Sequence, residues 1–448
     1  MRAHLLRRYG PKPIRGRAIA RLAAVILPFW SSPVVCQAAD ALPPLTLKEA
    51  HETAIRNHPL ISVAELKALA SLQVVKEARA GFFPNISINA VAVGTDNDNT
   101  RLEAVAALNN PAIFDRQANG LMISQLITDF GRTANLTGSA RLQAEAAANN
   151  ARATRDQILL AVDSAFYSAQ QAQAVTRVAE QTVTARQLFL DQVTAMATNK
   201  LKSDLDVSFA RVNVEDARLL LSKARNDLDA SFAQLSNILG LRQVRLYHLI
   251  EEPLPLPTST NVSDFVQQAL RERPDLMSLR NQQEAAVKLA RAERDARFPT
   301  ISAVGAAGVS PIHDNILPDN YAAAGLVINM PLFAGGLYTA RQRQAELQAQ
   351  ATQESLRSLE DNVVRDVHIA WLNAQNAFDR YRINQQLLDN ARQSYALAQA
   401  RYTNQLSSIV EFNQAELNLI SAQIGMANTQ YEYLLQRSAL TYQIGALR

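Results

Sequence analysis

Cysteine, histidine and catalytic motifs are scarce in this chain. Its 448 residues include one cysteine, Cys36, and six histidines that show no metal-ligand spacing. A phosphate-binding loop and a nucleophile elbow are both missing from the sequence. The sequence thus gives enzymatic chemistry no support, and we expect a protein that is not an enzyme and that uses no cofactor or metal.

Long apolar runs are confined to the N-terminus. Residues 1–38 open with seven basic residues and no acid, continue through an apolar stretch and end with small residues at Cys36 and Ala38. This pattern predicts a secretory signal peptide. Acylation of Cys36 is the alternative, but the three residues before it lack the leucine and the small residue typical of lipoprotein signals. Because Cys36 lies in or beside the leader, the mature chain forms no internal disulfide.

The leader also accounts for the positive charge. The chain carries 45 basic and 41 acidic residues, and loss of the seven leader cations leaves the mature chain at about −3. The overall charge therefore gives no argument for nucleic acid as a partner. After the leader, no apolar run approaches the ~20 residues that a membrane-spanning helix needs. A membrane-spanning form of this protein would have to use strands.

Proline is missing from two long stretches, 132–240 and 337–445, and the second repeats the first at a constant spacing of 205 residues. A fixed period of this kind is the signature of a duplicated architecture. Identical residues at this spacing include Leu121 and Leu326, Gly131 and Gly336, Asn199 and Asn404, Leu201 and Leu406, and Gly240 and Gly445.

Each proline-free stretch predicts a helical hairpin with a very long first arm. A helix from Arg132 to Thr198 would measure roughly 100 Å, which no globular core can bury, so it must pack along other helices. In the return arm large apolar residues step by seven, and small residues follow three positions later in most repeats, which allows neighbouring helices to approach closely. The large positions are Val207, Val214, Leu221, Leu228 and Leu235. An ordinary coiled-coil rod would explain these helices equally well.

Four strands placed between the helices argue against a rod. Ile86 and Ile88 fall on one face of a period-two pattern, with Asn85 and Ser87 on the other. We expect strands at 84–94, 119–128, 299–309 and 322–331, each about the length that crosses a bilayer at a tilt. Four strands leave open edges, which cost several kcal/mol per unpaired group in lipid, so several chains must share one barrel.

The predicted organisation is therefore one duplicated body, mostly α with transmembrane β. After the signal peptide at 1–38 we expect a first repeat at 39–250, a proline-rich linker at 251–262 and a second repeat at 263–448. Each repeat comprises a helix, two strands and a helical hairpin. The loop between the two strands is ten residues shorter in the second repeat.

This order, given twice after a signal peptide, resembles the TolC-like outer-membrane efflux family over essentially the whole mature chain. The residues that carry the resemblance are Phe83-Pro84 and Phe298-Pro299 at strand entry, Asp129-Phe130-Gly131-Arg132 and Leu332-Phe333-Ala334-Gly335-Gly336 at strand exit, and the turns at 199–210 and 404–415.

The resemblance implies a homotrimer in the outer membrane of a Gram-negative bacterium. Twelve strands, four from each chain, would form one barrel in outer-membrane lipid, and twelve helices would continue it as a periplasmic tunnel. The hairpin tips would meet a periplasmic adaptor, which joins the passive exit duct to an inner-membrane pump of RND, ABC or MFS type for efflux or type I secretion. Two alternatives from other classes are a periplasmic adaptor protein and a secreted structural coiled-coil protein.

The resemblance also implies where partners dock. The adaptor-docking tips would be formed by Asn199, Lys200, Leu201 and Ser203 in the first copy and by Asn404, Gln405, Leu406 and Ser408 in the second. The family's tip glycine would fall at Lys200 and Gln405. We expect Asn199 or Asn404 to supply the left-handed turn conformation instead, because asparagine tolerates it better than most residues.

A periplasmic aperture is implied just inside the tips, with Asp204, Asp206, Tyr402 and Glu411 as its residues. Threefold symmetry would turn each carboxylate that faces the axis into a ring that attracts cations. For Asp204, helix capping or a favourable helix-dipole interaction is an equally good interpretation. In the family, the tyrosine matching Tyr402 bonds the acid matching Asp206, and a basic partner in this network would fall at Ser407.

Overall fold

The computed structural model describes residues 42–93, 116–255, 261–312 and 319–447. The chain divides into Met1–Leu42 and Pro43–Arg448, and the second unit holds all of the described helices and strands. The predicted signal peptide and the alternative acylation of Cys36 thus lie outside the described residues, as does part of the predicted linker.

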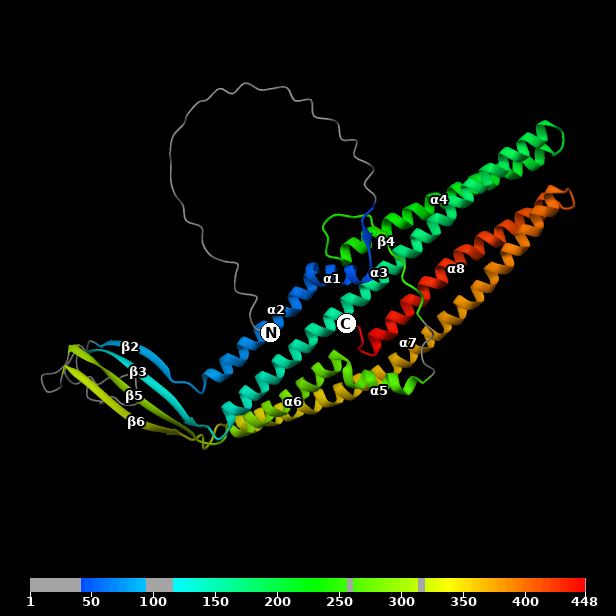
Figure 1. The fold of residues 1–448 in the computed structure, drawn as a ribbon. Coiled ribbons are helices and arrows are strands. Elements are labelled where there is room, and N and C mark those ends of the chain that lie inside the picture. Colours follow the sequence, from blue (N-terminus) through cyan, green and yellow to red (C-terminus); the bar gives the residue numbers. More distant parts are fainter. Residues whose placement is uncertain (1–41, 94–115, 256–260, 313–318, 448) are drawn as a thin grey trace, which may run out of the picture. The chain divides into compact units, whose positions relative to one another are not determined.

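The described residues form eight helices in two matching sets (Figure 1). The first set is α1 (Leu47–Asn57), α2 (Pro59–Ala80), α3 (Arg132–Thr198) and α4 (Asp204–Ile238), and the second is α5 (Val262–Glu272), α6 (Pro274–Asp295), α7 (Leu337–Thr403) and α8 (Ile409–Gln443). Both sets have lengths of 11, 22, 67 and 35 residues. The duplication therefore extends to every helix. Within the described ranges, none of these helices has the length and hydropathy needed to cross a membrane.

Each short helix pair is broken immediately before a proline. His58 is extended (φ −73°, ψ 121°), and its Nδ1 accepts the Leu60 N–H at 3.3 Å. Pro59 suits the first position of α2 because a proline has no N–H to leave unpaired there. Arg273, also extended, precedes Pro274 in the same way at the start of α6.

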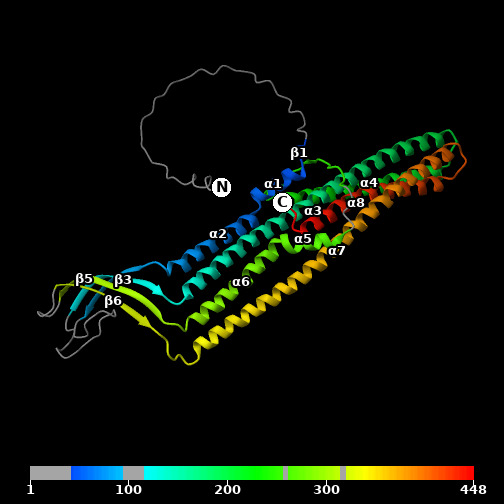
Figure 2. The ribbon, with the colours of Figure 1, turned by 60° about the horizontal axis from the view of Figure 1, so that its bottom comes forward.

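The long helices set the layout of the second unit. α3 packs along α4, and α7 along α8, while α2 and α6 cover the parts of α3 and α7 that the shorter return helices leave free. Figures 1 and 2 show both hairpin turns at one end of these helices and the strands at the other. At 1.5 Å per residue, α3 and α7 are each about 100 Å long.

The return helix α4 buries the small residues of its predicted heptad pattern. Ala210, Ala217, Ala224 and Ser231 are all buried, at the positions three residues after the large ones. Two of the large positions, Val214 and Leu235, are buried as well. Alanine at the contact positions brings the two helix backbones together, as the sequence predicts.

Four strands form one antiparallel sheet in the order β2-β3-β5-β6. Their bounds are β2 (Asn85–Val93), β3 (Arg116–Thr128), β5 (Thr300–Ile312) and β6 (Asn320–Asn329), and a separate two-residue parallel pair joins β1 (Pro44–Leu45) to β4 (His248–Leu249). β3 starts and β5 ends three residues beyond the predicted bounds, because the first residues of β3 pair with the end of β2 and Gln117 also pairs with Ile312. β6 ends before the predicted 331, since Pro331 has no N–H to donate to a ladder.

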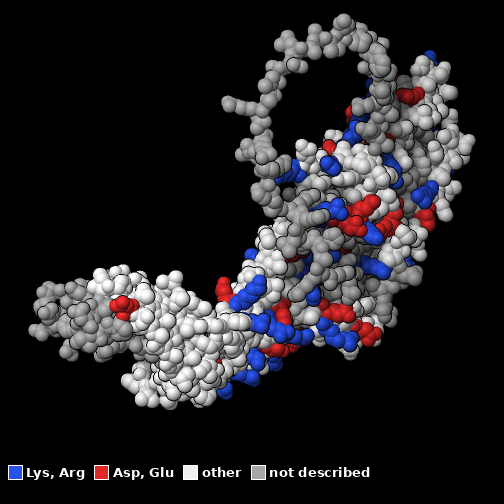
Figure 3. All heavy atoms as spheres, turned by 60° about the vertical axis from the view of Figure 1, so that its left-hand side comes forward, with Lys and Arg blue, Asp and Glu red and all other residues white. Residues whose placement is uncertain are grey.

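One face of this sheet is apolar and uncovered. Ile86 lies opposite Ile123, and Ile88 lies opposite Leu121, so their side chains share a face across β2 and β3. Ile88 is 79% exposed. In Figure 3 charged side chains gather over the helices and are few over the strands. In the part of the chain that the structure describes, β2 and β6 each have one edge without a partner strand.

Candidate functional site

Both hairpin turns close with the same hydrogen bonds. Lys200 has φ of 56° and its N–H donates to the Ala197 carbonyl at 2.9 Å, while the Leu201 N–H donates to the Met196 carbonyl at 2.9 Å. This pairing is the Schellman arrangement, which needs a left-handed residue after the helix cap. Gln405, with φ of 62°, closes the second turn in the same way.

The expectation that an asparagine supplies the left-handed residue is wrong. Asn199 and Asn404 have φ of −87° and −86°. Each occupies the cap position, where its side-chain amide donates to the carbonyl four residues earlier, at 2.8 and 2.7 Å respectively. Because the asparagine side chain is bonded at the cap position, the next residue takes the left-handed conformation that reverses the chain, although it is Lys200 or Gln405.

The serines and acids that follow the turns begin the return helices. Ser203 is the N-cap of α4: its hydroxyl accepts the Asp206 N–H at 3.2 Å, and the Asp206 carboxylate accepts the Ser203 N–H at 3.1 Å. Ser408 caps α8 by accepting the Glu411 N–H at 3.3 Å. Asp204 is the first helical residue, where its charge favours the helix dipole without capping it.

Tyr402 is buried at the end of α7, but the bond to Asp206 that the resemblance implies is not present. The Tyr402 hydroxyl has no hydrogen-bond partner among the described residues, and the Asp206 carboxylate is bonded to Ser203. Burial, helped by the nearby Asp206 charge, raises the pKa of Tyr402 to about 12. The hydroxyl thus stays neutral at physiological pH.

Two basic residues that the sequence analysis did not single out lie at this site. The Lys202 Nζ is 3.8 Å from the centroid of the Tyr402 ring. The Arg401 Nε is 3.5 Å from a carboxylate oxygen of Glu411 and links the two arms of the second hairpin. No periodicity relates Lys202 to Tyr402, because they belong to different copies and meet only through the fold.

An aromatic cluster joins the two hairpins behind the tips. Phe189 of α3 lies 5.7 Å from Tyr402 and 4.8 Å from Phe412 of α8, measured between ring centroids. Tyr395 of α7 completes the cluster at 5.6 Å from Phe412. These rings come from three helices, so they fix the ends of both hairpins against each other.

Polar contacts continue this connection deeper between the hairpins. The Asn213 amide donates to the Asn413 side-chain oxygen at 3.0 Å. Arg186 of α3 pairs with Glu416 of α8 at 3.2 Å, and both residues are buried. Burial raises the pKa of Glu416, against the lowering effect of the Arg186 charge.

Comparison with known proteins identifies the family. The family described as "Outer membrane efflux protein" matches residues 50–241 and 265–446. The chain belongs to this outer membrane efflux protein family.

Relatives in the family include the outer membrane protein TolC of Escherichia coli, which is 23% identical over 303 residues. That alignment covers 65% of this chain and 59% of TolC, and the TolC of Salmonella enteritidis is likewise covered over only 59% of its length. The probable efflux pump outer membrane protein TtgC of Pseudomonas putida is 25% identical over 413 residues, which cover 89% of this chain and 82% of TtgC.

Solved structures support the efflux-protein fold. A crystal structure of CusC aligns with a TM-score of 0.76 at 20% identity, over 89% of this chain and 92% of CusC. The outer membrane protein VceC of Vibrio cholerae aligns with a TM-score of 0.74 at 19% identity, over 89% of this chain and 96% of VceC.

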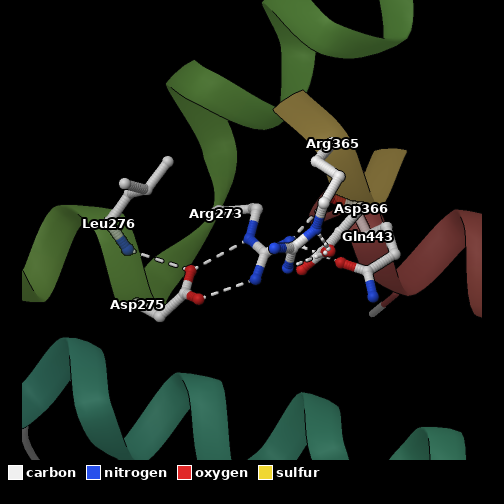
Figure 4. Close-up of polar contacts among 6 residues, drawn as sticks. All are labelled: Arg273, Asp275, Leu276, Arg365, Asp366 and Gln443. Atoms are coloured by element: carbon white, nitrogen blue, oxygen red, sulfur yellow. Dashed lines mark hydrogen bonds and ion pairs between the residues drawn. The ribbon is translucent and has the colours of Figure 1, made fainter. Parts of the chain in front are cut away.

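A second polar cluster in this family member lies far from the tips (Figure 4). The Arg273 guanidinium makes two bonds to the Asp275 carboxylate, at 3.1 and 2.7 Å, and also donates to the Gln443 side chain at the end of α8. Burial alone would raise the pKa of Asp275, but the bonds from Arg273 hold it below its usual value. The brace ties the start of α6 to the end of α8.

Proposed function

We propose that this chain is one of three protomers of an outer-membrane exit duct, with a tunnel that extends into the periplasm. The observation that carries the proposal is the four-stranded sheet, whose apolar face is uncovered and whose edges at β2 and β6 lack partner strands in the described part of the chain. In hydrocarbon, open edges would cost several kcal/mol per unpaired group. Copies of the same sheet joined edge to edge in one barrel remove this cost.

The helical hairpins are the evidence for the periplasmic part of the duct. Two 67-residue helices in each protomer are long enough to continue the barrel as a tunnel wall of about 100 Å. Such a duct conducts passively and requires neither catalysis nor a cofactor. Substrates for efflux or type I secretion would be delivered by an inner-membrane pump of the RND, ABC or MFS type.

The hairpin tips would receive a periplasmic adaptor. Leu201 and Leu406 are 62% and 70% exposed at the two turns, although apolar side chains of this size gain from burial. They offer an adaptor one apolar contact on each tip. The cap residues beside them hold the turns in place, namely Asn199, Ser203, Asn404 and Ser408. The proposed partners are outer-membrane lipid at the sheet and an adaptor at the tips, and nucleic acid is not among them.

The acids beside the tips are evidence for an aperture. Asp204 and Glu411 are exposed and lie in the first turns of α4 and α8, and the charge of Asp206, also in the first turn of α4, acts on Tyr402. In a threefold assembly each acid that faces the axis would become a ring of three. Such rings attract cations and repel anions at the periplasmic entrance.

A matched pair of charged variants tests the duct. Ile88→Lys places a charge on the uncovered apolar face of β2, where it would cost about 2–4 kcal/mol in lipid, whereas Ser87→Lys places it on the opposite face. We expect wild type and Ser87→Lys to fractionate with the outer membrane as heat-resistant trimers, and Ile88→Lys to be lost from it. Wild-type protein that stays soluble after lysis, or that fractionates with the inner membrane, would rule out the duct.

A further inference from the structure

Lys202, in the turn between α3 and α4, reaches across to the second hairpin. Its ammonium nitrogen lies 3.8 Å from the centroid of the Tyr402 ring in the last turn of α7. The same ring stacks on Phe412 of α8 and packs against Phe189 of α3, with centroids 5.5 and 5.7 Å away. The ammonium therefore sits on an aromatic stack built from three helices, a geometry in which cation–π attraction acts.

The Tyr402 ring, and not its hydroxyl, makes this connection. The hydroxyl is buried and has no hydrogen-bond partner among the described residues. The Asp206 carboxylate, whose charge reaches Tyr402, is held by the backbone and side chain of Ser203. Substitution of the hydroxyl should therefore leave the attachment intact, whereas loss of the ring should remove it.

The contact lies nearer the turns than the other polar links between the hairpins. Asn213–Asn413 and the buried Arg186–Glu416 pair join the same two hairpins further from the tips. The pair formed by Arg401 and Glu411 is also near the turn, but it stays within the second hairpin. Of the charged contacts near the turns that the structure describes, the Lys202 contact is the one that resists separation of the two tips.

We propose that Lys202 is a positioning residue of the closed duct end, where it clamps the first hairpin tip to the second until the end opens. The proposal rests on the proposed function, since a closed end has meaning only in a duct. To widen a ring of helices at its end, the tips must move apart, so the open state lacks this contact. Loss of a partly exposed cation–π contact should then raise the open fraction by about two- to fivefold per protomer.

Conductance of the purified full-length protein in planar lipid bilayers tests the clamp. Lys202→Met and Tyr402→Leu should each raise the resting open fraction by about two- to fivefold or more. Lys202→Arg and Tyr402→Phe should match wild type, because a cation and a ring remain. Arg211→Met is the control, since it removes an exposed cation of α4 that lies outside the docking tips. The melting temperature of Lys202→Met should equal that of wild type, whereas a merely structural role would lower it.

Three results would overturn the clamp. If Tyr402→Phe raised the open fraction as much as Tyr402→Leu, the hydroxyl and not the ring would keep the end closed. Equal opening by Arg211→Met and Lys202→Met would show that the overall positive charge of the first hairpin keeps the end closed. No opening by Lys202→Met would show that Lys202 does not keep it closed.

A wild-type protein that forms no channels would refute the duct itself, so a second measurement keeps the two questions separate. Amide hydrogen exchange at Leu201 and Leu406 reports the turns whether or not ions pass. Lys202→Met should accelerate this exchange by about two- to fivefold, and Arg211→Met should not. Unchanged exchange in Lys202→Met would show that this contact does not hold the two tips together.

Discussion

The first hairpin turn should become more stable when glycine replaces the strained residue. Lys200 has φ of 56°, and a non-glycine residue in this left-handed region costs about 1–2 kcal/mol. Lys200→Gly removes that cost but gives the unfolded chain more freedom, which costs about 0.4–1 kcal/mol. The balance is a gain of about 0.7 kcal/mol in the free energy of local unfolding, or about threefold slower exchange.

The Leu201 amide is the place to measure this gain, since its bond to the Met196 carbonyl closes the turn. Hydrogen exchange at Leu201 should slow about threefold in Lys200→Gly. Lys200→Ala separates the backbone effect from loss of the lysine charge, because alanine is strained at the same φ, and it should give no gain.

The neighbouring residue supplies a control of opposite sign. Asn199 has φ of −87°, where glycine gains nothing, and Asn199→Gly also loses the side-chain bond to the Ala195 carbonyl. Exchange at Leu201 should therefore be faster in Asn199→Gly than in wild type. Slower exchange in Asn199→Gly, or no slowing in Lys200→Gly, would show that the left-handed strain at Lys200 does not limit the turn.

Three further predictions concern buried charges. Arg186→Met leaves the Glu416 carboxylate buried and unpaired, so it should lower the unfolding free energy by about 3–5 kcal/mol in denaturant titrations, and Arg186→Met with Glu416→Leu should recover most of the loss. Because burial raises the folded-state pKa of Glu416, the folded state holds the proton more tightly, and wild type should gain stability relative to Glu416→Gln as the pH falls toward 4.5. Arg273→Lys breaks the two-bond brace to Asp275 and should cost about 1–3 kcal/mol, whereas the exposed Arg271→Lys should change stability little.

The sequence predicted the elements that depend on pattern alone. The hairpins follow from proline-free stretches and from a heptad repeat in which small residues come three positions after most of the large ones. The strands follow from a period of two around Ile86 and Ile88. Strand ends were less predictable, because the extra residues are held by pairing with neighbouring strands: those of β3 pair with β2, and Gln117 also pairs with Ile312 of β5. A side-chain pattern within one strand carries no information on where a partner strand ends.

The tip residues show why the site was harder to predict than the fold. The sequence indicated which residues lie at the turns, but it assigned the left-handed conformation to the wrong neighbour, since asparagine tolerates that conformation better than lysine or glutamine. Helix capping by the Asn199 and Asn404 side chains outweighs this preference. The contacts of Lys202 with Tyr402 and of Arg186 with Glu416 span 200 and 230 residues, which no local pattern reveals.

Duplication makes the two tips alike in backbone and different in side-chain chemistry. Lys202 and Ser407 occupy the same position of the two copies, 205 residues apart, after turns that close with the same hydrogen bonds. The family resemblance implies a basic residue at Ser407, whereas here the base is in the first copy and contacts the ring of the second. Because the two tips lie together, either copy can supply a cation to the region around Tyr402. The position of the cation in the sequence can therefore differ between the two copies while its place beside the Tyr402 ring stays the same.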